Sequence, residues 1–337
     1  LATVCDVMPL RKLNRLIALV ALKHFDLNKN IAINEILDLT NKKKRLDIND
    51  LGYLIGPILN AGGRLGKSGF ASELLSSDNL KIVNKKAIEL IKLNNKRKEI
   101  ETLTLNQINL NKIERENKSV IIYYSSNINE GLIGIIAARL KDYFYKPVIV
   151  ITTSGKILKG SARSIYNYNV GRAIKKSLDK NLIINGGGHN MAAGFSLEKN
   201  NLNRFKDFII NDFSGSISDI DFKFSYDAEI SSHAFNNDFY SDVKKLEPFG
   251  TGNPDPIFLF KDLRTIKSTS LNNKHVSAIL KSKVGHSINS ISFNSLNDKV
   301  GEYLLNYKKT FSVLGHINEN IWNNKKALQL IIKDLII

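Results

Sequence analysis

The residues best suited to chemistry in this chain are glycines followed by a histidine. The range 185–194 contains Gly186, Gly187 and Gly188, and His189 comes next. Glycine permits positive φ and lets backbone N–H groups approach an anion closely, and an imidazole can donate a hydrogen bond to a phosphate oxygen. The segment predicts a tight glycine loop that binds phosphate through Gly187, Gly188 and His189. A glycine turn beside a core histidine is the alternative, because glycine-rich loops alone are weak signals.

Two further stretches combine small residues with one arginine each. Residues 56–66 surround Arg64 with glycine and alanine, and residues 160–164 contain Ser161 and Arg163. A guanidinium binds phosphate through two parallel hydrogen bonds. Both stretches are therefore predicted to bind an anion, the first as a tightly packed loop. A solvated loop arginine is the alternative for Arg64.

Asp6 is a candidate metal ligand. It follows the apolar run 1–5, which is typical of a strand, and Pro9 prevents that strand from continuing as a central one. A carboxylate at such a turn suits a hard metal ion, although aspartate is also a frequent cap or turn former. The run starts at Leu1 without a charged leader, so we expect the chain to begin inside a domain.

Composition favours a nucleic-acid partner. Lys and Arg number 49 against 32 Asp and Glu, a net charge of +17, although a bias of the source genome toward lysine would weaken this argument. No run of about 18 apolar residues is present, which argues against a membrane. Cys5 is the single cysteine, so an internal disulfide and a cysteine metal cluster are excluded, and a cytoplasmic location is expected.

The length of 337 residues indicates two or three domains. Residues 78–117 lack proline and glycine and are polar nearly all round in the middle, which is typical of a helix between domains. The order of strand, helix and strand after it predicts a small α/β domain with partly parallel pairing. We expect helices at 15–25, 68–76, 130–144, 171–178 and 202–213, and strands at 119–124 and 147–152.

Beyond an expected linker at 213–218, short strands follow one another with a helix near 238–246. This pattern predicts a small β-barrel of the oligonucleotide-binding (OB) kind, with a sandwich as the alternative. The expected strands are 222–230, 263–270, 275–280, 287–293, 310–317 and 326–332.

Six stretches, in order, resemble motifs of the RecJ family of single-strand-specific DNA exonucleases, which belongs to the DHH phosphoesterase superfamily. They are TVCDVMPL at 3–10, LNAGGR at 59–64, EGLIGI at 130–135, GSARS at 160–164, GGHNMAAG at 187–194 and EPFGTGNP at 247–254. The resemblance implies an α/β plus β-barrel fold: the end of a DHH catalytic domain at 1–77, a connecting helix at 78–118, a DHHA1 domain at 119–214 and an OB-fold at 218–337.

The resemblance also implies an activity, a 5′-to-3′ exonuclease on single-stranded DNA in repair and recombination, with two Mn²⁺ or Mg²⁺ ions activating water. It makes Asp6 a catalytic metal ligand and assigns the 5′ phosphate to Arg64, Ser161, Arg163 and the segment Gly187 to His189. The barrel would bind the single strand along its basic face. A helicase and a single-strand-binding protein are the expected protein partners.

Departures from the family pattern are also visible. Ile58 stands where family members usually carry a further arginine, and Gly62 replaces an alanine. The Asp-His-His motif that supplies most metal ligands is absent, so we expect the chain alone to be inactive. A nuclease-dead protein that binds single strands is the alternative function, and the barrel argues against a cyclic-dinucleotide phosphodiesterase.

Overall fold

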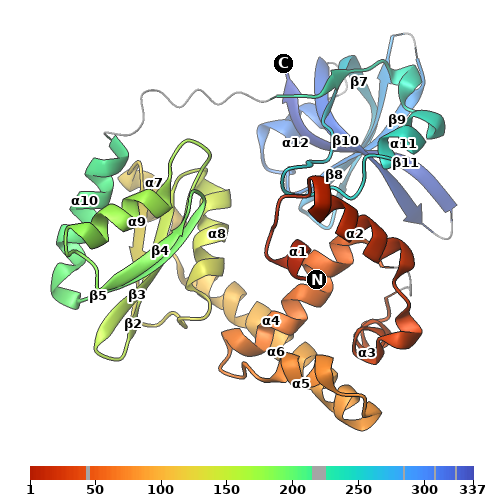
Figure 1. The fold of residues 1–337 in the computed structure, drawn as a ribbon. Coiled ribbons are helices and arrows are strands. Elements are labelled where there is room, and N and C mark those ends of the chain that lie inside the picture. The colour runs from red at the N-terminus through yellow and green to blue at the C-terminus, as the bar shows by residue number, and fades with distance from the viewer. Residues whose placement is uncertain (43–45, 215–224, 284, 307–308, 323–324) are drawn as a thin grey trace. The chain divides into compact units, whose positions relative to one another are not determined.

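The computed structural model describes residues 1–42, 46–214, 225–283, 285–306, 309–322 and 325–337 (Figure 1). The chain forms two compact units, one of residues 26–221 and the other of residues 1–25 with 222–337. The expected linker beyond Ser214 and the start of the strand expected at 222–230 lie outside the described residues. The fold class, α/β plus β-barrel, is confirmed by the elements of the two units.

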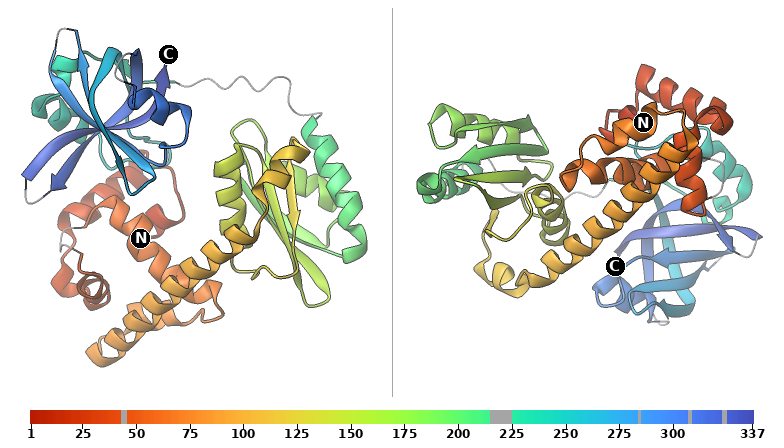
Figure 2. Two further views of the ribbon diagram at one scale, coloured as in Figure 1. Left: turned by 180° about the vertical axis from the view of Figure 1, so that it is seen from behind. Right: turned by 90° about the horizontal axis from the view of Figure 1, so that it is seen from below.

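The unit of residues 26–221 begins with helices packed along one long helix, α6. Val83, Ala87 and Leu90 of α6 are buried against this layer, and Figure 2 shows α6 as one continuous helix. The helical prediction for 78–117 is confirmed, with a break after Gln107 that separates α6 from α7. The helices are α3 (Ile31–Leu39), α4 (Gly56–Arg64), α5 (Phe70–Ser76), α6 (Leu80–Gln107) and α7 (Leu110–Glu116), with a π-helical segment, η2 (Asp50–Ile55), before α4.

The stretch around Arg64 is a helix, α4, and the loop prediction was wrong. Pro57 stands near the start of α4, where its missing N–H costs nothing. Gly62 permits close packing, because a Cβ there would lie 2.5 Å from the carbonyl oxygen of Lys67 and 3.3 Å from Leu90 on α6. Ile58 is buried in this packing. Small residues were a signal of contact between helices here.

The same unit continues with a five-stranded sheet in the order β1-β2-β3-β5-β4. β1 and β2 pair in parallel and the other neighbours are antiparallel, which confirms the predicted partly parallel α/β domain. The strands are β1 (Ile121–Tyr124), β2 (Val148–Ser154), β3 (Ile157–Arg163), β4 (Asn185–His189) and β5 (Ala192–Leu197), and the helices are α8 (Ile133–Phe144), α9 (Val170–Asp179) and α10 (Leu202–Ser214).

Alternation along β2 explains how helices cover this sheet on both faces. Val148 and Val150 pack against α8, whereas Ile149 and Ile151 join the core formed with α9 and α10. Successive strand residues point to opposite faces, so a continuous apolar run is what a doubly covered strand requires. Figure 1 shows α8 on one side of the sheet and α9 with α10 on the other.

The glycine segment is the edge strand β4, not a tight loop. None of its glycines has positive φ, and residues 182–184 before it form a bend. Gly186 and Gly188 serve packing: a Cβ on Gly186 would lie 2.8 Å from Ile174 of α9, and one on Gly188 would overlap the backbone of β5. Antiparallel pairing with β5 satisfies this backbone in place of a turn.

The other unit contains the barrel, and the OB-type prediction is confirmed. Its strands follow the order β10-β11-β9-β8-β7-β6, and pairing of β10 with β7 closes the sheet, which excludes the sandwich. The strands are β6 (Ala228–Glu229), β7 (Phe258–Leu271), β8 (His275–Ser282), β9 (Ser287–Ser292), β10 (Thr310–Trp322) and β11 (Lys325–Ile336), and the helices are α11 (Asn237–Lys244) and α12 (Lys299–Leu304).

The N-terminal segment of this unit packs on the turn that precedes the barrel. Arg15 of α2 (Lys12–His24) donates to the carbonyl oxygens of Lys245, Leu246 and Glu247 at 3.1, 3.0 and 2.8 Å. These carbonyls follow the end of α11, where a cation is favourable to the helix dipole. Leu10 N–H also donates to the Thr251 carbonyl oxygen at 2.6 Å. The TVCDVMPL and EPFGTGNP stretches therefore meet.

The strand expected at 1–5 is a short helix, α1 (Ala2–Cys5). Its backbone bonds locally, with Cys5 N–H donating to the Leu1 carbonyl oxygen at 2.9 Å and Asp6 N–H to that of Ala2 at 2.8 Å. Among the described residues no strand pairs with this run, so local bonds satisfy the backbone groups. The helix expected at 15–25 is confirmed as α2.

Candidate phosphate site

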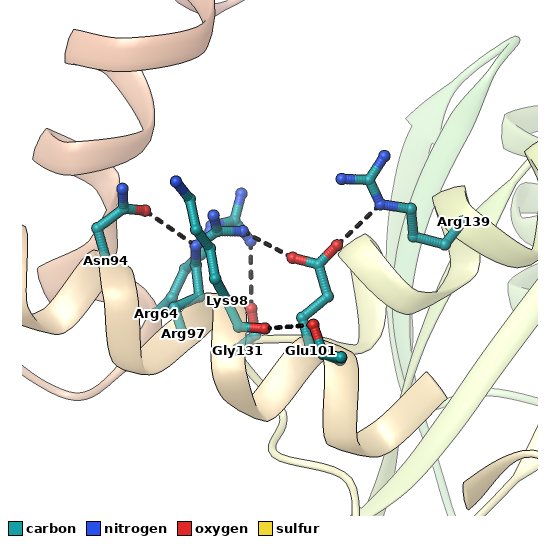
Figure 3. Close-up of polar contacts among 8 residues, drawn as sticks. Arg64, Asn94, Arg97, Lys98, Glu101, Gly131 and Arg139 are labelled. Atoms are coloured by element: carbon teal, nitrogen blue, oxygen red, sulfur yellow. Dashed lines mark hydrogen bonds and ion pairs between the residues drawn. The ribbon is translucent and has the colours of Figure 1, made fainter. Parts of the chain in front are cut away.

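Arg64 is held against the turn that precedes α8. Its guanidinium donates from Nη1 to the carbonyl oxygen of Gly131 at 3.2 Å (Figure 3). A Cβ on Gly131 would overlap the carbonyl oxygen of Arg64 itself, so only glycine permits this approach. Packing thereby joins the LNAGGR and EGLIGI stretches, which are distant in sequence.

Arg163 ends β3 and lies against the first turn of α8. Its Nη1 donates to Ser161 Oγ at 3.1 Å and to the Ala162 carbonyl oxygen at 2.8 Å. A Cβ on Gly134 would lie 2.9 Å from Arg163 Nη2 and 3.2 Å from Ser161 Oγ. The GSARS stretch therefore meets EGLIGI as well, and α8 presents the positive end of its dipole to this region.

The two guanidinium groups are poorly compensated. Burial, and then the charge of Arg97, lowers the pKa of Arg64, while burial, and then the charge of Arg64, lowers the pKa of Arg163. Arginine stays protonated at neutral pH, so the lowered values mean that both cations are partly desolvated and lie near another cation, while the charge of Glu101 offsets part of this effect at Arg64. In the described part of the chain neither guanidinium has a carboxylate within ion-pair distance. A bound anion would relieve both penalties.

Strand register places His189 on the same sheet face as Arg163. Both residues pair with Ala192 of β5, Arg163 from β3 and His189 from β4. Residues paired across a sheet share a face, and two strand spacings separate these by about 10 Å. Ser161 and Gly187 likewise both pair with Gly194. One sheet face therefore carries two rows of paired residues, one with Arg163 and His189 at its ends and one with Ser161 and Gly187 at its ends.

The glycines of these rows leave part of this sheet face without side chains. Gly187 and Gly194 are exposed, and a Cβ on Gly187 would have nothing within 4 Å. His189 is exposed as well, and its Nδ1 accepts from Met191 N–H at 3.4 Å. Gly188 lies on the opposite face, in contact with β5. The structure thus brings Ser161, Arg163, Gly187 and His189 to one face and separates Gly188 from them.

Asp6 belongs to the other unit. It is exposed and follows the last residue of α1. The described residues contain no group of three or more His, Cys, Asp or Glu side chains that could hold a metal ion. A two-ion centre needs several such ligands. The donor set of the described residues does not fit that centre.

A groove of about 360 Å³ crosses the barrel. The polar side chains that line it carry hydroxyl or amide groups, apart from one cation, Lys267. The apolar side chains that line it are aliphatic. The lining residues are Lys267, Ser268, Thr269, Ser277, Ala278, Ile279, Asn289, Asn320, Ala327, Leu328 and Gln329. Side chains of this kind bind base edges by hydrogen bonds, and a lysine binds phosphate.

Sequence reasoning missed three contributors to the phosphate site. Gly131 and Gly134 were recognised as part of a motif without a role, and Arg97 was taken as one of many polar residues on a long helix. The i, i+4 spacing of Arg97 and Glu101 was the available signal for an ion pair on α6.

In the described ranges, no helix is both long and apolar enough to cross a membrane.

Comparison with known proteins gives two domain matches and similarity along nearly the whole chain. Residues 117–215 match the DHHA1 domain and residues 226–334 match the RecJ OB domain. The single-stranded-DNA-specific exonuclease RecJ of Haemophilus influenzae is 30% identical over 98% of this chain and 60% of its own length. RecJ of Bacillus subtilis is 27% identical over 99% of this chain and 43% of its own. The chain thus spans about half the length of these relatives.

The fold is shared with RecJ from Thermus thermophilus. Its crystal structure in complex with Mn²⁺ matches with a TM-score of 0.84 at 23% identity, over 99% of this chain and 48% of that one. Its complex with Mg²⁺ matches with a TM-score of 0.82. Domain matches in order, similarity along the chain and a common fold agree, and the chain therefore belongs to the RecJ family.

Proposed function

We propose that this chain is part of a 5′-to-3′ exonuclease specific for single-stranded DNA, and that its own residues bind the 5′ phosphate and the strand behind it. One observation carries the proposal. Arg64, at the turn before α8, and Arg163, at the first turn of α8, converge on the start of this helix, both partly desolvated and neither paired with a carboxylate within the described residues. A terminal phosphate is a dianion at neutral pH, and it would compensate both charges.

Each residue of the site has a separate task. Arg163 and Arg64 donate hydrogen bonds to the phosphate oxygens, and Ser161 adds a hydroxyl donor beside Arg163. Gly187 leaves the sheet face open, so the sugar-phosphate backbone can lie flat on it. His189, about 10 Å from Arg163 across the sheet, would contact the backbone farther along the strand.

The barrel would bind the following nucleotides. Its groove offers hydroxyl and amide groups to base edges and Lys267 to a phosphate. The net charge of +17 adds affinity that does not depend on sequence. We further propose a role in DNA repair and recombination in the cytoplasm, with a helicase supplying single strands and a single-strand-binding protein as a second partner.

Metal ions would supply the hydrolytic chemistry by activating water. The RecJ structures from Thermus thermophilus contain Mg²⁺ or Mn²⁺, and the resemblance makes Asp6 one ligand of such a centre. The described residues supply no further cluster of ligands. The side chains of the phosphate site and the barrel groove therefore account for substrate binding, and hydrolysis is not assigned to them.

The proposal is tested by comparing oligonucleotides with a 5′ phosphate and a 5′ hydroxyl. Charge-assisted hydrogen bonds from two arginines should make the phosphorylated strand bind about tenfold more tightly or better. Arg163→Ala should remove most of that preference. Arg204→Ala is the matched control, because Arg204 is exposed on α10. Fluorescence anisotropy titrations give both dissociation constants.

Two results would contradict the phosphate site. The unmodified chain could bind both strands equally, in which case no terminal phosphate is recognised. Arg163→Ala and Arg204→Ala could also lower binding of both strands to the same degree, which would indicate only a general charge effect.

A further inference from the structure

Glu101 of α6 is a buried carboxylate with two arginine partners. Its exposed fraction is 7%, and it accepts from Arg97 Nη1 at 3.0 Å and from Arg139 Nε at 2.8 Å. Arg97 lies on α6 and Arg139 on α8, so the carboxylate joins the two helices (Figure 3). A carboxylate this deeply buried requires such partners, because an unpaired charge there would be strongly destabilising.

The guanidinium of Arg97 is held by two hydrogen-bond partners, Glu101 and Asn94. Its Nε donates to Asn94 Oδ1 at 3.1 Å, and Asn94 is itself buried. In this position the charge of Arg97 acts on Arg64 and contributes to lowering the pKa of Arg64. Glu101 therefore holds the cation that lies beside a residue of the phosphate site.

Helix α8 is attached to the neighbouring helices at two places. The Gly131 carbonyl oxygen just before α8 accepts from Arg64 of α4, and Arg139 within α8 donates to Glu101 of α6. Eight residues separate the two attachments, and the part that lies in α8, from Ile133 to Arg139, rises about 9 Å. Two attachments at this separation restrict both the translation and the tilt of α8.

We propose that Glu101 is a positioning residue for the phosphate site: by bridging Arg97 and Arg139 it fixes α8 against α6, so that Arg64, Arg163 and the first turn of α8 meet at one anion. This inference rests on the proposed function and deepens it. Bridging the guanidinium groups of Arg97 and Arg139 requires a carboxylate on a side chain as long as that of glutamate. Glutamine offers one acceptor oxygen for two guanidinium groups, and aspartate is one methylene too short to reach both.

A second buried carboxylate provides the control. Asp212 of α10 has a side-chain exposure of 8%, and it accepts from Lys176 Nζ at 2.5 Å and from Tyr168 Oη at 3.3 Å. It joins α10 to α9 on the sheet face opposite α8. Asp212→Asn therefore removes a comparable buried charge from the same unit and leaves the phosphate site in place.

The experiment measures the ratio of dissociation constants for 5′-hydroxyl and 5′-phosphate oligonucleotides. Glu101→Gln and Glu101→Asp should each lower this ratio about fivefold, and Asp212→Asn should leave it within about twofold of the parent. Thermal unfolding establishes that each variant is folded at the temperature of the titration. Arg139→Ala, at a side chain that is 60% exposed, should lower the ratio and add nothing to the effect of Glu101→Gln.

Each outcome decides one claim. A parent protein without preference for the 5′ phosphate would refute the proposed function and this inference with it. A parent with preference, retained in Glu101→Gln, would refute the positioning role alone, and so would an equal loss in Asp212→Asn. Should Glu101→Gln not fold, Arg139→Ala gives the decision: an unchanged ratio overturns the proposal.

Discussion

At the scale of single residues, two helical glycines differ in what surrounds them. Gly134, in the first turn of α8, faces Arg163 and Ser161 so closely that a Cβ would lie 2.9 and 3.2 Å from their side-chain atoms. Gly63, in α4 beside Arg64, has nothing within 4 Å of that position. The absence of a side chain at Gly134 therefore leaves room for the arginine, whereas Gly63 is in open space.

We predict that Gly134→Ala lowers the preference for a 5′ phosphate by about tenfold without lowering thermal stability. The methyl group would displace the Arg163 guanidinium by a few tenths of an ångström, and positioning of donors decides such recognition. Alanine is the better helix former, which offsets the crowding. Anisotropy titrations with both oligonucleotides and a thermal melt measure the two effects.

Gly63→Ala is the control for this prediction. It gains the same helix propensity and lies next to Arg64 in sequence, so it should keep the preference within about twofold. An equal loss in both variants would mean that the glycines act through the helices themselves and not through space for Arg163.

The anion-binding chemistry of the site residues was predictable from the sequence, but their convergence in the folded structure was not. Arg64, Ser161 and Arg163 were expected to bind an anion because of their functional groups and small neighbours. Their convergence depends on Gly131, which permits the backbone of Arg64 to approach, and this contact joins residues that are 67 positions apart. No local pattern encodes a contact of that sequence separation.

At the scale of elements, the glycine segment shows where local reasoning failed. Successive glycines predicted a turn with positive φ, since glycine weakens strands. The long-range partners decided otherwise: β5 pairs with residues 185–189, and Gly171 of α9 lies against the backbone of His189. By contrast, the apolar run of β2 and the periodicity of α8 were predictable, because their burial pattern is local.

The barrel groove is the element whose role can be tested separately. We predict that Lys267→Ala weakens binding of single-stranded oligonucleotides several-fold and reduces the slope of log affinity against log salt by about 0.7. Asn289→Ala should weaken binding with no change in that slope, because an amide displaces no counterions. Anisotropy titrations across a salt series measure both quantities.

Lys261→Ala is the matched control on the same strand. Lys261 is exposed on β7 and pairs with Glu229 at 2.7 Å, outside the groove. It should change affinity and slope little. Equal effects at Lys261 and Lys267 would indicate that net charge, and not the groove, binds the strand.

At the scale of the whole molecule, the metal chemistry gives a prediction. Two cations about 3.5–4 Å apart require several ligands, and one carboxylate cannot hold them. We predict that the 337-residue chain binds single-stranded DNA and hydrolyses it no faster than background with Mn²⁺. Release of acid-soluble nucleotides from a labelled strand measures this rate.

The same assay on a longer protein, with the additional length that the relatives have, should show 5′-to-3′ release of nucleotides. Asp6→Ala in that protein should abolish cleavage and leave DNA binding unchanged. Metal-dependent digestion by the 337-residue chain, or full activity in the longer Asp6→Ala protein, would show that the assignment of Asp6 is wrong.

The hydrogen bonds between Arg15 and the carbonyl oxygens that follow α11 limit how the barrel can be exchanged between related proteins. Leu10 and Arg15 bond to the turn that leads into the barrel, and together with residues 222–337 they form one compact unit. A chimera that grafts a relative's residues for 222–337 alone would break these bonds. A compatible graft must carry its own counterpart of residues 10–15, because the two segments form one compact unit although they are far apart in the sequence.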